Sequence, residues 1–153
     1  MVDQKFSSEP PLPDEPRLRK AIELMYFAYR AFTAPPDRIL EERGLGRVHH
    51  RILYFVGRNP QISVNALLGV LGVSKQALNG PLRQLVGLGL VAMDTAVHDR
   101  RVRQLRLTAV GEALEGRLTG AQMEHFQAAF AQAGIDAEAG WVAVMEGLVG
   151  TGR

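Results

Sequence analysis

The chain has 153 residues, 46% hydrophobic and 22% charged, a length and balance that predict one folded domain with a buried core. It has no Cys, which excludes disulfides, thiolate catalysis and Cys-ligated zinc. The N-terminus lacks a signal-peptide pattern, and the longest apolar run, residues 85–93, is far short of a membrane span. We therefore expect a soluble, cytoplasmic protein with no membrane partner and no cofactor.

Charge is strongly segregated along the chain, although the net charge is only +2. Between Arg43 and Leu107 there are ten Lys or Arg and only two acids, Asp94 and Asp99, which gives +8. From Thr108 onward two Arg and six acids give −4. A basic centre of this kind favours binding to a polyanion, and an ordinary solvated surface is the plainer alternative.

The N-terminal third begins with a proline-rich stretch. Residues 1–16 contain four prolines and are expected to form a flexible, extended arm. Residues 17–33 are predicted to form a helix that is apolar on nearly every side, which in a small protein indicates a subunit interface. Pro35 and Pro36 are expected to end this helix, with a short helical turn following at 38–43.

Three helices are predicted in the centre of the chain, at 47–58, 64–71 and 75–88. The second and third are preceded by the N-cap residues Ser63 and Ser74, because a serine hydroxyl can accept an unpaired N–H of the first turn. A short turn containing Gly joins these two helices. This arrangement is the helix-turn-helix pattern.

The last part of the chain combines a hairpin with two long helices. Residues 90–93 and 102–107 are predicted strands, and the polar, basic segment at 94–101 makes them a β-hairpin wing. A long helix capped by Thr108 runs to about residue 133. An amphipathic helix at 136–149 follows and needs a partner surface. The expected fold is mainly α with a small β-hairpin wing: a winged helix-turn-helix with N- and C-terminal dimerisation helices.

Two segments resemble the MarR (multiple antibiotic resistance regulator) family. The stretch Leu-Gly-Val-Ser-Lys-Gln-Ala-Leu-Asn at 71–79, continued at 85–91, resembles the recognition helix of that family and its exit into the wing. The stretch Asp-Arg-Arg at 99–101, followed by a strand, Leu-Thr at 107–108 and Gly111, resembles its wing signature.

The resemblance covers about residues 17–150 and implies one domain. Its winged-helix DNA-binding lobe spans about 38–107, and its dimerisation region comprises 17–33 and 120–150. It also implies a homodimer that binds a pseudo-palindromic operator in double-stranded DNA, and a small-molecule effector in a cleft between the two regions. We therefore expect a transcriptional regulator, a repressor, and not an enzyme. The alternative is a winged-helix protein–protein interaction module or a corepressor that does not bind DNA.

The predicted recognition helix buries one face, formed by Leu78, Leu82 and Leu85. An ordinary solvated face is the alternative to DNA contact for its other side. Gly80-Pro81 departs from a regular helix, because proline donates no hydrogen bond to the Ala77 carbonyl, and predicts a kink or a later start. The residues expected to contact DNA have side chains suited to phosphates or base edges, namely Ser74, Lys75, Gln76, Asn79 and Arg83.

The predicted wing carries Arg100, Arg101 and Arg103 toward DNA. Asp99 is two residues from Arg101, so the carboxylate can pair with the guanidinium and hold it extended for the minor groove. The family resemblance assigns Asp99 and Arg101 these same roles. The alternative is a surface ion pair that contributes little, with the other arginines merely touching phosphate.

Tyr26, Tyr29 and His49 are candidates for an effector pocket, and a core or interface histidine is the alternative for His49. His50 is expected to face away from the apolar side of its helix, and His98 to face phosphate or solvent in the wing. No His, Asp or Glu grouping has metal-ligand spacing, and no catalytic motif is present.

Overall fold

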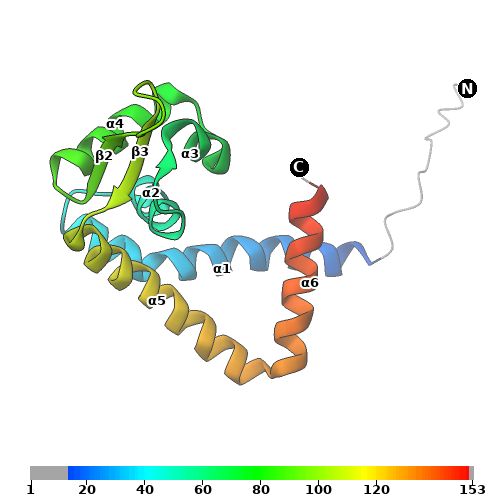
Figure 1. The fold of residues 1–153 in the computed structure, drawn as a ribbon. Coiled ribbons are helices and arrows are strands. Elements are labelled where there is room, and N and C mark those ends of the chain that lie inside the picture. Colours follow the sequence, from blue (N-terminus) through cyan, green and yellow to red (C-terminus); the bar gives the residue numbers. More distant parts are fainter. Residues whose placement is uncertain (1–13, 152–153) are drawn as a thin grey trace, which may run out of the picture. The chain divides into compact units, whose positions relative to one another are not determined.

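The computed structural model describes residues 14–151 (Figure 1). The chain divides into two compact units between Phe32 and Thr33. Residues 1–13 of the predicted flexible arm lie outside the described residues, and its last two, Glu15 and Pro16, already belong to the first helix. No helix in the described part of the chain is both long enough and apolar enough to cross a membrane.

Helix α1, Glu15–Glu41, runs through Pro35 and Pro36. The prediction that these prolines end the helix is wrong, and the turn predicted at 38–43 is largely the last turn of α1. Two backbone hydrogen bonds are lost at the prolines. Burial offsets this loss, because Pro36 is buried and Leu40 is completely inaccessible to solvent. Tertiary packing therefore outweighs local helix propensity here.

Helices α2 (Arg47–Arg58), α3 (Val64–Leu71) and α4 (Lys75–Gly87) confirm the three predicted central helices. Ser63 Oγ accepts the Ala66 N–H at 3.0 Å and Ser74 Oγ accepts the Ala77 N–H at 3.1 Å, so both predicted N-caps form.

Helix α4 begins directly after Ser74 and includes Pro81, so the predicted later start is wrong. The buried leucines of α4 hold it in place on either side of the proline.

A three-stranded antiparallel sheet has the order β1-β3-β2, with β2 at Val91–Thr95 and β3 at Arg103–Leu107. These two strands confirm the predicted hairpin, and Figure 1 shows it beside α4. Strand β1, Ile62–Ser63, was not predicted, because two residues carry no alternating pattern. It pairs with β3 and places the start of α3 next to the wing.

The hydrophobic core lies between the α2–α4 helices, the sheet, the end of α1 and the start of α5. Its completely buried members are mostly leucines, a residue type that packs well in helix interfaces. They include Leu40, Ile52, Leu53, Leu67, Leu85, Leu105 and Leu118.

Helix α5, Ala109–Ala133, starts at the predicted cap Thr108. Thr108 Oγ1 accepts the Gly111 N–H at 3.0 Å and donates to the Gly89 carbonyl at 2.6 Å. A Cβ on Gly111 would overlap the carbonyl oxygen of Leu90. The Leu-Thr-x-x-Gly pattern therefore has a packing cause: it docks the start of α5 on the chain that leads into β2.

Helix α6, Ile135–Thr151, follows the turn at Gly134, whose positive φ of 100° suits glycine. An aromatic cluster of Phe126, Phe130 and Trp141 joins α5 to α6, with ring centroids 5.0 to 5.4 Å apart. Such contacts fix the angle between the two helices.

Candidate nucleic-acid interface

The recognition helix α4 separates a buried face from an exposed one, as the sequence predicts. Leu78, Leu82 and Leu85 are at most 4% exposed. Every residue proposed to contact DNA from this helix and its cap is exposed, namely Ser74, Lys75, Gln76, Asn79 and Arg83. Ser74 accepts the Ala77 N–H and so retains its own O–H as a donor.

The wing contains the predicted pairing of Asp99 with Arg101. Asp99 Oδ1 accepts the backbone N–H of Arg101 at 3.0 Å and its Nε–H at 3.2 Å, while Oδ2 accepts Nη2 at 3.3 Å. These hydrogen bonds, led by those from the guanidinium, hold the pKa of the Asp99 carboxyl below its ordinary value. The Arg101 side chain is nevertheless 90% exposed, so its pairing with Asp99 orients it without covering it.

The turn of the wing is closed by its own backbone. The Val102 N–H donates to the Asp99 carbonyl at 3.0 Å, and the Ala96 N–H donates to the Val102 carbonyl at 2.8 Å. Arg100 and His98 are exposed beside this turn, in keeping with the expectation that His98 faces phosphate or solvent. The hydrogen bonds to the carboxylate and the carbonyl of Asp99 thus define the direction in which the wing presents its cations.

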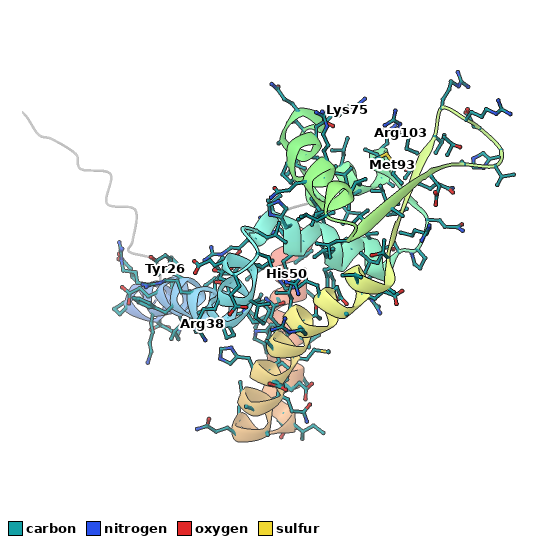
Figure 2. The ribbon with its side chains drawn as sticks, turned by 90° about the vertical axis from the view of Figure 1, so that its left-hand side faces the viewer. Tyr26, Arg38, His50, Lys75, Met93 and Arg103 are labelled. Atoms are coloured by element: carbon teal, nitrogen blue, oxygen red, sulfur yellow. The ribbon has the colours of Figure 1, made fainter. Side chains whose placement is uncertain are left out.

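A hollow of about 410 Å³ lies between the recognition helix and the wing. Lys75 and Asn79 line it from α4, and Arg101 and Arg103 line it from the wing. Figure 2 shows Lys75 on α4 and, facing it, Arg103 and Met93 on the strands of the wing. Arg103 Nη1 donates a weak hydrogen bond to Met93 Sδ at 3.6 Å. The hollow is therefore concave and rich in cations and amides.

Several residues of this hollow were not predicted as site residues, among them the polar Ser63 and Asn65 at the start of α3 and Met93 on β2. The two α3 residues come close to the wing because β1 pairs with β3, with Ser63 opposite Gln104. A two-residue strand has no recognisable sequence pattern, so the sequence does not predict that Ser63 and Asn65 lie near the wing. For Met93 the sequence predicts only a place in a strand.

His50 lies away from the apolar arc of α2, as its place in the helix predicts, but it is buried. Helix α5 covers that side: Thr119 Oγ1 lies 3.3 Å from His50 Nε2 and donates to Glu115 Oε1 at 2.8 Å. Burial lowers the pKa of His50 below 6.5, and the nearby carboxylates of Glu115 and Asp37 oppose this shift.

His49 is a buried histidine with two hydrogen bonds. Its Nδ1 accepts the Gly46 N–H at 2.9 Å, and its Nε2 lies 2.9 Å from Gln84 Oε1 on α4. Tyr26 and Tyr29 are exposed on α1, in the N-terminal unit, whereas His49 belongs to the other unit. The effector pocket formed by these three residues stays a prediction.

Metal binding finds no support in the part of the chain that the structure describes. It contains no group of three or more His, Asp or Glu that could hold an ion.

Comparison with known proteins identifies the family. Residues 43–102 match the sequence model of the MarR family. The HTH-type transcriptional regulator PetP of Rhodobacter capsulatus is 48% identical over 138 residues, which cover 90% of this chain and 82% of that protein. The chain belongs to the MarR family. It is accordingly a transcriptional regulator, and the resemblance found in the sequence is confirmed.

Solved structures of MarR-family regulators share the fold. One from Silicibacter pomeroyi has a TM-score of 0.73 at 20% identity, covering 87% of this chain and 90% of that one. The S. aureus MepR–DNA complex has a TM-score of 0.70 at 17% identity, covering 84% and 96%. The predicted winged-helix fold is thereby confirmed, with α3 and α4 of this MarR-family chain as the helix-turn-helix and β2–β3 as the wing.

Proposed function

We propose that this MarR-family regulator binds a pseudo-palindromic operator as a homodimer and represses transcription. The observation that carries the proposal is the Asp99–Arg101 pair in the wing. A carboxylate on a surface that meets phosphate repels DNA, so its presence there indicates a structural role. Here it accepts three hydrogen bonds from one arginine, which hold the guanidinium in one orientation and lower the entropic cost of binding.

The guanidinium donors of Arg101 that Asp99 does not bind are suited to contacts in a DNA groove. Asp99 uses Nε and Nη2 of the guanidinium, so Nη1 stays available to acceptors on DNA. A side chain that is 90% exposed and already oriented can enter the narrow, electronegative minor groove.

The recognition helix complements the wing. Gln76, Asn79 and Arg83 carry the donor and acceptor groups that read adenine and guanine edges in the major groove. Between them and the wing, the hollow with Lys75 and Arg103 suits a phosphodiester strand passing from one groove to the next. S. aureus MepR, which shares this fold, has been solved with DNA, and this supports the same class of partner.

Dimerisation accounts for the exposed apolar residues at both ends of the chain. On α1, Ile22 and Phe27 are 69% and 56% exposed, and on α6, Val144 and Leu148 are 62% and 53% exposed. Monomeric proteins rarely leave so much apolar surface to water. A second copy of the chain is the partner we propose for these helices, which also matches a two-fold operator.

A small-molecule effector remains part of the proposal. Tyr26, Tyr29 and His49 are its candidate residues. No Cys is present, so relief of repression by thiol oxidation is not available to this chain.

Selection of bound duplexes from a random pool tests the proposed function. We expect an enriched pseudo-palindromic site, and an affinity that falls steeply as salt rises because phosphate contacts release counterions. A protein that enriches no site and shows no salt-sensitive binding to duplex DNA contradicts the proposal. That result favours the interaction module instead.

A further inference from the structure

His49 joins the start of α2 to the recognition helix from a buried position. Its ring is 8% exposed, and Nδ1 accepts the Gly46 N–H. A neutral ring that accepts at Nδ1 carries its proton on Nε2, so Nε2 donates to Gln84 Oε1. We propose that His49 is a positioning residue for DNA recognition, which holds the second half of α4 so that Arg83 meets the operator. This inference rests on the proposed DNA binding.

The helical turn around Pro81 is a weak turn in the middle of α4. The hydrogen bond between His49 and Gln84 holds the part of the helix that follows it. Pro81 has no N–H, so the Ala77 carbonyl lacks its usual helical donor. The preceding residue is Gly80, which adds backbone freedom. The first half of α4 is fixed by the Ser74 cap, but that cap lies on the far side of the weak turn from Arg83.

Gln84 is well placed to fix the second half. At 100° per residue it lies on the flank of α4, between the buried side of Leu85 and the exposed side of Arg83. Buried leucines resist separation of the helix from the core more strongly than they resist small rotations about its axis, because apolar contacts are non-directional. A hydrogen bond at the flank is directional and opposes such rotation.

The neighbouring His50 provides a matched control. It is buried to almost the same degree as His49, at 9% against 8% exposed. Its partner, however, is Thr119 on α5 and not a residue of α4. Replacement of the His50 imidazole therefore perturbs the core to a similar extent without releasing the recognition helix.

The first experiment compares two affinities at fixed salt, for the selected operator and for a random duplex of equal length. Gln84→Met keeps the side-chain length but removes the acceptor, and Gln84 is exposed, so the fold survives. We expect operator affinity to fall roughly tenfold, since a lost part-buried hydrogen bond and misplaced base contacts together cost about 1–2 kcal/mol. Random-duplex affinity should be unchanged, because Lys75 and the wing cations that face phosphate lie outside the second half of α4.

The second experiment asks whether the effect runs through His49 and the proline. His49→Phe keeps the ring but not its hydrogen bonds, and should lower the ratio of operator to random affinity as Gln84→Met does. In the His49→Phe background, Gln84→Met should add nothing. Pro81→Ala restores the missing N–H, and should reduce the loss caused by Gln84→Met. His50→Phe should leave the ratio unchanged.

Four results overturn the inference: an unchanged ratio in Gln84→Met, additive losses in the double variant, no suppression by Pro81→Ala, or an equal loss of the ratio in His50→Phe. If the unmutated protein binds no duplex DNA, the proposed function fails as well. If it binds its operator and the ratio is insensitive to Gln84, only the positioning role is refuted.

Discussion

At the scale of single residues, Asp99 has two opposite effects on the affinity for DNA. Its carboxylate repels phosphate, but it also holds the exposed Arg101 guanidinium in one orientation through three hydrogen bonds. In Asp99→Ala the repulsion and the positioning are lost together. If positioning is the larger effect, the variant binds its operator more weakly although it is less acidic.

We therefore predict that Asp99→Ala lowers operator affinity, measured by fluorescence anisotropy at fixed salt, and that Arg101→Ala lowers it further while the fold is kept. Asp94→Ala is the matched control. Asp94 pairs at 3.0 Å with Arg106, further from the wing tip, so its removal should leave affinity unchanged or raise it. Tighter binding by Asp99→Ala would refute the positioning role.

His50 makes stability depend on pH. Burial lowers its pKa below the ordinary 6.5, so the unfolded chain takes up a proton at a pH where the folded chain does not. The stabilisation is complete above 6.5 and is lost as the pH falls toward the folded pKa. We predict that acidification from about pH 7 to about pH 5 destabilises the protein less in His50→Gln than in the unmutated chain.

Urea unfolding at several pH values measures this dependence. His98→Gln, at an exposed wing position, is the control and should keep the original pH dependence. Identical pH profiles for His50→Gln and the unmutated protein contradict the prediction.

At the scale of elements, the junction between α4, β2 and α5 depends on a glycine. Leu90 is 3% exposed, and its carbonyl accepts the Thr108 N–H at 3.1 Å, so it cannot retreat from a side chain at position 111. We predict that Gly111→Ala destabilises the protein by about 1–3 kcal/mol through overpacking, as measured by urea unfolding.

Gly116→Ala in the same helix is the matched control, because its Cβ would meet nothing within 4 Å. It should stabilise the protein by roughly 0.5–1 kcal/mol, the ordinary helix preference for alanine over glycine. Equal effects of the two substitutions would show that the close approach to Leu90 does not matter.

The same junction explains which elements the sequence could predict. The caps Ser63, Ser74 and Thr108 act within three residues of themselves, and the wing pair spans two, so local spacing was sufficient to predict them. The continuation of α1 past Pro36 was not predictable in this way. It depends on burial of Leu40 against residues far along the chain.

The candidate site shows the same division. Its exposed α4 residues and wing arginines were predicted from helical periodicity and charge. The burial of His50 depends on the packing of α5 against α2, and the hydrogen bond between His49 and Gln84 joins residues 35 positions apart. No local sequence pattern predicts either contact, so both are visible only in the folded structure.

At the scale of the whole molecule, the distribution of apolar surface predicts that chains associate. The core is built around α2–α4 and the sheet, and it leaves Ile22, Leu24 and Phe27 of α1 more than half exposed. Val144, Leu148 and Val149 of α6 are exposed to a similar degree. Covering a large aliphatic or aromatic side chain contributes about 1.5–3 kcal/mol, so several such residues together can drive association.

We predict that the protein sediments as two chains at micromolar concentration, and that Ile22→Asp shifts it toward the monomer, since burying an unpaired carboxylate at the interface is costly. Val97→Asp is the control: Val97 is the most exposed of the large apolar residues that the structure describes, but it lies at the wing tip, so the variant should remain dimeric. Because two half-sites need two recognition helices, Ile22→Asp should also lose operator affinity more than random-duplex affinity. A folded, monomeric unmutated protein, or an Ile22→Asp variant that stays dimeric, would exclude α1 from the interface.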